Sequence, residues 1–280
     1  VQFANKHLKK IEFRVGIMKS AGELRENFIL FLRAYHKVIL DNYCDEESKV
    51  VREFPKVAIV YHLNRRDDNT SGRRCWRDYV QDKQMNVAVI NFLKLQNEYL
   101  NQVSLLKELR NSDYRIANYI VGLDAASMEN VTPVWVFAPI FERARDGRDD
   151  TLYESSKYPV RSLRFTFHAG EDFRHILSGI RRIDEVIRFC KFHAGDRIGH
   201  GVALGIDPEE WAAEYSMITI PRIEMLENLL WAWMVLSEEA QEMDGIKFYL
   251  EENIYHHAKE IYGNMQGVTV NALLESYKLL

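Results

Sequence analysis

The chain has 280 residues, of which 47% are hydrophobic and 28% charged, and its formal net charge is −4. This is the composition of an ordinary globular protein, with no global signal for nucleic acid or an anionic membrane surface. Cys44, Cys75 and Cys190 stand far apart with no C-x-x-C pair, which excludes a disulfide framework and a cysteine-ligated zinc site. We therefore expect a cytoplasmic protein.

The first residues and the most apolar later stretch of the sequence give no signal for a membrane protein. No apolar signal segment opens the sequence, which also lacks an initiator Met, so we expect it to be part of a longer protein. The most apolar later stretch, Leu226–Leu236, is interrupted by Glu227 and Asn228 and is too short to span a bilayer.

Six short apolar strands are predicted, in alternation with helices. The strands are Ile11–Ile17, Lys56–His62, Asn118–Asp124, Ser162–His168, Asp196–His200 and Ser216–Ile220. Segments with apolar residues at helical spacing lie between them, including Glu23–Asn42, Gln84–Leu109 and Ser178–Phe192. Apolar strands alternating with helices indicate a parallel α/β sheet, and this number of units favours a (β/α)8 TIM-type barrel.

Polar loops and further helices complete the predicted organisation. Arg65–Arg77 and Arg143–Lys157 are polar stretches that we interpret as loops. After residue 222 the pattern becomes helical, over Ile223–Met243, Phe248–Tyr262 and Ala272–Leu280. We therefore expect a barrel portion over residues 1–222 and a helical extension or insertion over residues 223–280.

Two histidines stand where predicted strands end. His168 follows the run SLRFTF and precedes Ala-Gly-Glu171, and His200 stands between two glycines in the run RIGHG. Side chains at the carboxyl ends of parallel barrel strands converge on one mouth. A histidine ligand, a carboxyl group and a second histidine facing one substrate suit metal-assisted hydrolysis. The alternative for each histidine is a hydrogen-bonded ring with no chemical role.

These motifs resemble those of the adenosine and AMP deaminase family of metal-dependent hydrolases. FTFHAGED, then DRIGHG, with Gly122-Leu-Asp124 upstream, occur in the family's order, and the resemblance extends over about residues 11–222. It implies a barrel that lacks its first and last strands here, and a Zn²⁺ ion with His168 as a ligand. The implied reaction is hydrolytic deamination of an adenine nucleoside or nucleotide at purine C6, which gives the inosine form and ammonia.

The resemblance also implies a role for each motif residue. Glu171 would transfer a proton to a purine ring nitrogen, and His200 would orient and polarise the zinc-bound hydroxide. Gly170 and Asp124 would lie against the substrate. Capping of the following helix is an equally good role for Asp124, because Ala125-Ala-Ser127 replaces the small residue and glycine that usually follow it in the family.

A basic cluster follows the second predicted strand. It contains His62, Arg65, Arg66, Arg73 and Arg74. Forked guanidinium groups suit phosphate, so Arg65 and Arg66 are predicted contacts to the phosphate of a nucleotide substrate. Solvated surface charge is the alternative interpretation.

Two parts of the family pattern are absent from this chain. No H-x-H pair occurs anywhere, and no S-x-N-T-D-D-P-like segment follows Ile220. Because a zinc site normally takes three or more protein ligands, we expect the remaining ligands to lie outside these residues. A catalytically inactive scaffold subunit and another amidohydrolase-type hydrolase therefore stay open as alternatives.

The helices after residue 222 carry a narrower resemblance. They are similar to an elaboration found in large bacterial deaminase-like proteins, including those paired with an ATPase in RADAR-type phage defence. This similarity implies a homo-oligomer, and an ATPase is the partner that it suggests.

Overall fold

The computed structural model describes residues 7–45, 52–66, 85–146, 162–239 and 244–278. Its centre is a parallel sheet whose strands pair in the order in which they occur along the chain. The strands are β1 (Lys10–Gly16), β2 (Lys56–Asn64), β3 (Ile120–Ala126), β4 (Arg164–Ala169) and β5 (Arg197–His200). The fold is therefore α/β, as the alternation of strands and helices predicts.

The prediction of a (β/α)8 barrel is wrong. The described residues form a five-stranded half-barrel with β1 and β5 at its edges, and no backbone pairing joins these edges within that part of the chain. The predicted strand Ser216–Ile220 is also wrong: it is irregular, and Met217 is almost fully exposed. Its apolar side chains satisfy the local pattern of a strand, but they meet no neighbouring strand to pair with.

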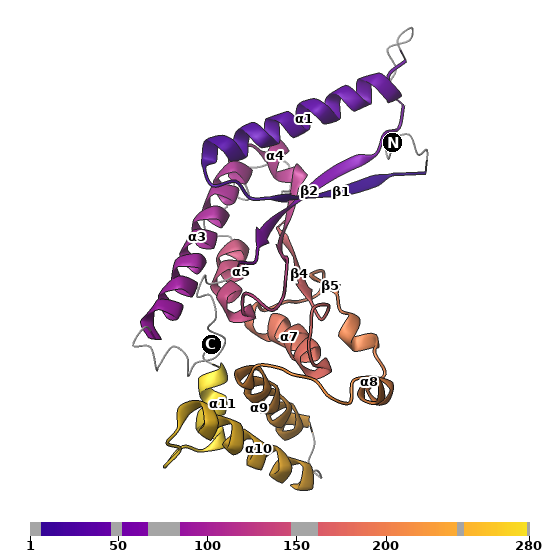
Figure 1. The fold of residues 1–280 in the computed structure, drawn as a ribbon. Helices are drawn as coiled ribbons and strands as arrows, with labels where there is room; N and C mark the ends of the chain where they lie inside the picture. Colours follow the sequence, from indigo (N-terminus) through magenta and orange to yellow (C-terminus); the bar gives the residue numbers. More distant parts are fainter. Residues whose placement is uncertain (1–6, 46–51, 67–84, 147–161, 240–243, 279–280) are drawn as a thin grey trace.

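Helices pack along the sheet and at its two ends, as Figure 1 shows. The longer ones before residue 190 are α1 (Ala21–Tyr43), α3 (Met85–Asn111) and α7 (Ile176–Phe189). Shorter turns of helix are α4 (Tyr114–Tyr119), η2 (Val134–Phe137), α5 (Ala138–Arg145), η4 (Val202–Gly205) and α8 (Pro208–Glu214). Within the described residues, no helix is both long and apolar enough to cross a membrane.

Alternation along the strands gives the sheet one apolar and one polar face. The apolar face packs against the helices through Ile59, Tyr61, Leu63, Leu123, Phe165 and Phe167. The opposite side of the same strands, which we call the polar face, carries Glu12, Arg14, His62, Asp124, Thr166, His168 and Arg197. Arg197 on β5 donates to Glu12 on β1 at 2.8 Å, so side chains of the two edge strands meet across this face.

The predicted helices after residue 222 are confirmed, and they have a hydrophobic cluster of their own. They are α9 (Arg222–Glu239), α10 (Asp244–Tyr262) and α11 (Val270–Lys278). Buried polar contacts join them to α7: Arg181 donates to Asn228 at 2.8 Å, and Tyr277 donates to Glu185 at 2.6 Å. The division of the chain at residue 222 stays a prediction.

The apolar residues at helical spacing in the predicted helix Ser178–Phe192 form a buried stripe on α7 only in part. Ile183, Val186 and Cys190 are buried as expected, but Ile187 is exposed. Ile187 follows Val186 directly and so points about 100° away from it around the helix, where no other element covers it.

Candidate active site

The polar face brings two predicted site residues, Asp124 and His168, together with Arg14, which the sequence motifs do not include. Asp124 on β3 is fully buried and accepts a hydrogen bond from Arg14 on β1 at 2.5 Å. The same guanidinium nitrogen lies 3.0 Å from Nε2 of His168 on β4, which is itself 3.3 Å from the Asp124 carboxylate. Asp124 thus lies inside a strand, and its alternative role as a helix cap is wrong.

The predicted catalytic pair lies at the carboxyl ends of β4 and β5. Nε2 of His200 is 3.0 Å from a carboxylate oxygen of Glu171, and the two side chains are 39% and 45% exposed. The rings of His168 and His200 meet edge to face, with their centroids 4.9 Å apart. The structure therefore assembles His168, His200 and Glu171 at one edge of the sheet, open enough for a ligand to reach them.

Glu129 holds the loop that carries Glu171. Its buried carboxylate accepts the backbone N–H groups of Gly170 at 2.9 Å, Glu171 at 2.7 Å and Asp172 at 3.3 Å. Gly170 has a φ of 78°, and a Cβ there would lie 2.6 Å from Ile183, so only glycine fits. These contacts fix where the backbone of Glu171 leaves the sheet.

The backbone of His200 adopts a conformation that few side chains accept. Its φ is 65°, in the left-handed region that is uncommon for residues other than glycine. Strain of this kind is frequent at functional sites. The neighbouring Gly199 leaves room for the other ring, because a Cβ there would lie 2.6 Å from Cδ2 of His168.

The two arginines predicted to contact phosphate, Arg65 and Arg66, have different surroundings in the structure. Arg65 is only 5% exposed, and its terminal nitrogens donate to the main-chain oxygens of Ser127 at 3.0 Å and His168 at 2.5 Å. Burial lowers the pKa of Arg65 to about 10. In this arrangement Arg65 ties together the ends of β3 and β4. Arg66 is exposed on the surface, where it pairs with Glu98 at 2.5 Å; Arg73 and Arg74 lie outside the described residues.

His62 on β2 lies on the polar face beside Asp124, which is its partner in the strand register. Burial lowers its pKa, against an upward effect of the Asp124 carboxylate. Nε2 of His62 and Oδ1 of Asp124 are both buried, and neither has a hydrogen-bond partner among the described residues. This face therefore contains two buried polar atoms whose hydrogen-bonding capacity is unused among the described residues.

The described residues do not fit a zinc ion on their own. Nowhere in the part of the chain that the structure describes do three His, Cys, Asp or Glu side chains come together as a metal-binding group. His168 and Asp124 lie 3.3 Å apart, and the positive guanidinium of Arg14 contacts both side chains. A zinc ion at His168 would require further ligands and a displacement of Arg14.

Two contributors to the site lie outside the sequence motifs. Arg14 belongs to a strand in which Glu12 and Arg14 alternate with apolar residues, so both charges fall on one face. That alternation is a usable signal, because a charged residue on a partly buried strand face needs a partner. Glu129 lies in a loop after β3, and its role depends on contacts to a segment 41 to 43 residues away.

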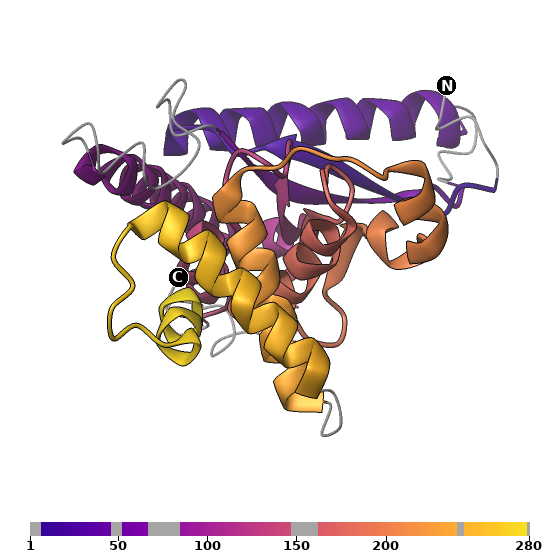
Figure 2. The ribbon, with the colours of Figure 1, turned by 60° about the horizontal axis from the view of Figure 1, so that its bottom comes forward.

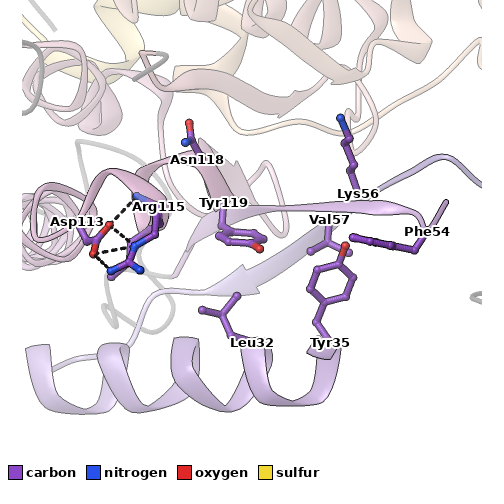
Figure 3. A pocket seen from close by; sticks show the side chains of 10 residues that line it. Leu32, Tyr35, Phe54, Lys56, Val57, Asp113, Arg115, Asn118 and Tyr119 are labelled. Atoms are coloured by element: carbon purple, nitrogen blue, oxygen red, sulfur yellow. Dashed lines mark hydrogen bonds and ion pairs between the residues drawn. The ribbon is translucent and has the colours of Figure 1, made fainter. Parts of the chain in front are cut away.

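A pocket of about 660 Å³, shown in Figure 3, lies at the start of β2, whereas His62 and the candidate site lie toward the carboxyl ends of the strands. It is formed between α1, the start of β2 and α4, and its lining includes Leu32, Tyr35, Phe54, Val57 and Tyr119. Asp113 and Arg115 on its rim bind each other at 2.6 Å. Because this lining is largely apolar and contains no histidine, we place the candidate site at the carboxyl ends of the strands.

No protein-family model and no curated protein matches this chain. The resemblance to adenosine and AMP deaminases therefore rests on the motif residues, and it stays a prediction.

Proposed function

We propose that this protein catalyses the hydrolytic deamination of an adenine nucleoside or nucleotide. In this reaction water adds at purine C6, the bond from C6 to the amino nitrogen breaks, and ammonia leaves. The observation that supports the proposal is the contact of 3.0 Å between Glu171 and His200, beside the ring of His168 at a shared sheet edge. The proposed compartment is the cytoplasm, in keeping with the free thiols of Cys44 and Cys190.

Proton transfer is the part of the reaction that these residues supply. The carboxyl group of Glu171 is exposed on one side and bonded to His200 on the other, so it can exchange a proton with a purine ring nitrogen. His200 holds the carboxyl group in place and accepts or returns the proton. The backbone contacts of Glu129 keep the loop of Glu171 in position for this exchange.

Asp124 and His62 offer polar atoms that suit a purine. With a purine bound, Oδ1 of Asp124 would accept a hydrogen bond, and the ring of His62 would donate or accept one. A purine ring presents both kinds of partner at its nitrogens. His168 remains the predicted zinc ligand, but no step of this proposal passes through the metal.

A non-catalytic subunit is the second candidate, and one observation favours it. The Arg14 guanidinium lies 3.0 Å from the imidazole nitrogen that would bind zinc, and it also neutralises Asp124. In an inactive relative, a fixed cation of this kind would replace the metal and preserve the fold.

Ammonia release distinguishes the two candidates. The purified protein is incubated with adenosine and with AMP, in parallel with added zinc and with a chelator, and both ammonia and the inosine-form product are measured. Equal amounts of the two products, lost in the Glu171→Gln variant, would support deamination. A correctly folded protein that gives no ammonia from either substrate and binds no zinc would support the non-catalytic subunit.

A further inference from the structure

Helix α10 carries apolar side chains on two sides, about 100° apart around the helix axis. Its inner face, formed by Leu250, Ile254, Ala258 and Ile261, is buried in the cluster shared with α9 and α11. Its outer face carries large apolar side chains that are exposed, among them Phe248, Tyr255 and Tyr262. A surface helix normally has a single apolar stripe facing the core, so a second stripe indicates a second partner.

The three outer aromatic residues form one line along the helix. They are spaced seven residues apart, which is close to two helical turns, and they therefore point within about 40° of one another over a length of about 21 Å. In Figures 1 and 2 α10 lies at the edge of the molecule. We call Phe248, Glu252, Tyr255, Lys259 and Tyr262 the α10 stripe.

Two opposite charges lie within the α10 stripe. Glu252 and Lys259 stand four residues after Phe248 and four residues after Tyr255, so both lie between aromatic rings. Both are exposed. Among the described residues, neither side chain has an ion pair or a hydrogen bond. The line therefore reads aromatic, acidic, aromatic, basic, aromatic.

Two copies of the α10 stripe that run in opposite directions are complementary, because acidic and basic side chains then face each other and aromatic side chains face aromatic ones. If a second α10 runs antiparallel across a two-fold axis at Tyr255, Phe248 faces the partner's Tyr262, and the two Tyr255 rings meet. Glu252 then lies within one residue of the position opposite the partner's Lys259, and symmetry repeats the pair. A two-fold interface uses the same patch on both copies, which is the property that this stripe has.

We propose that α10 pairs with α10 of a second copy of this chain, antiparallel and through the α10 stripe. Aromatic side chains supply the contact area and the two ion pairs set the register. A single helix pair is smaller than a standard interface of about 1,600 Å². The dimer is therefore weak enough to dissociate on dilution. This proposal does not depend on the proposed enzyme activity.

Variants with one charge reversed, and a double variant with both reversed, test whether the two α10 helices pair in this register. Sedimentation equilibrium of the full chain at several concentrations should show a monomer–dimer equilibrium. Glu252→Lys and Lys259→Glu should each weaken the dimer by about tenfold or more, because each places like charges together twice. The double variant Glu252→Lys/Lys259→Glu restores both pairs and should recover most of the affinity. Glu26→Lys and Lys37→Glu, at exposed positions on α1, are the matched controls and should change nothing.

The aromatic part of the α10 stripe has a control on the same helix. Tyr255→Ala should abolish measurable pairing, whereas Tyr249→Ala should retain it, since Tyr249 is exposed but points about a third of a turn away. Circular dichroism of each variant checks that the fold is intact. A protein that is monomeric at every concentration would overturn the proposal. A dimer whose affinity does not respond to the charge reversals, or is not restored in the double variant, would overturn it equally.

Discussion

Nη1 of Arg14 lies 2.5 Å from the buried carboxylate of Asp124, across β2, which separates their two strands. This ion pair fixes the polar face, because Arg14 also contacts His168. Arg14→Met keeps the volume of the side chain and leaves Asp124 as a buried charge without its partner. We expect the free energy of unfolding in urea to fall by about 3 kcal/mol.

Arg197 provides the comparison for Arg14. Its ion pair with Glu12 lies on the same face but is half exposed, and exposed pairs contribute about 0–1 kcal/mol. Arg197→Met should therefore change the unfolding free energy by less than about 1 kcal/mol. If Arg14→Met and Arg197→Met lower the free energy of unfolding equally, the burial of Asp124 does not make its ion pair with Arg14 more stabilising than an exposed pair.

The two neighbouring arginines after β2 should have different roles. Arg65→Ala removes charged donors from the main-chain oxygens of Ser127 and His168, and hydrogen bonds of this kind contribute about 1.5–3 kcal/mol each. We expect a clear drop in the temperature of unfolding. Arg66→Ala breaks an exposed pair with Glu98 and should change stability by about 1 kcal/mol at most.

The predicted phosphate contact can be tested at Arg66 alone. If Arg66 leaves Glu98 to bind the phosphate of a nucleotide, Arg66→Ala should raise KM for AMP about tenfold and leave KM for adenosine unchanged. Steady-state kinetics with both substrates measure this difference. A parallel change for the two substrates would mean that Arg66 does not recognise phosphate.

Stability should decrease in mild acid because of His175. Nδ1 of His175 caps α7 by accepting the N–H of Leu177 at 3.0 Å, which requires an unprotonated ring nitrogen. Burial lowers the pKa of His175 below its ordinary value of 6.5, against an upward effect of Glu224. The unfolded chain therefore takes up a proton at a higher pH than the folded protein. The contribution of neutral His175 to folding stability is complete above pH 6.5 and is lost as the pH falls through the lower pKa of His175 in the folded state.

His175→Asn should flatten this pH dependence. Asparagine is a good helix N-cap and does not titrate, so the variant keeps the cap at every pH. Urea unfolding between pH 5 and pH 8 measures the effect, with His36→Asn at an exposed position on α1 as the control. A slope that is the same in His175→Asn and wild type would rule out His175 as a source of the acid sensitivity.

Local patterns predict the strands of this fold well, but not their closure. Each of the five strands lies within two residues of its predicted start, because alternation and helical spacing are local properties. A closed barrel is a non-local property that depends on pairing between distant edges. Ser216–Ile220 has the composition of a strand, but nothing within that segment specifies a neighbour for it.

The same distinction applies to the candidate site. The motifs HAGE and RIGHG predict that His168, Glu171 and His200 lie together, since adjacent parallel strands end at one edge. Arg14 and Glu129 could not be assigned from motifs, because their partners are 110 and 41 residues away. Arg65 was predicted to bind a substrate phosphate, whereas its forked donors bind main-chain oxygens. Composition does not reveal which acceptor a buried arginine meets.

The most direct test of the proposed chemistry is the turnover of Glu171→Gln. This variant keeps the shape of the side chain and removes the acid, whereas Asp172→Asn makes the same change at the adjacent exposed carboxylate. With both variants folded as wild type, Glu171→Gln should lower kcat for deamination by a factor of about 100 or more, and Asp172→Asn should stay within a few-fold of wild type. A Glu171→Gln variant that turns over substrate within a few-fold of wild type would contradict the account.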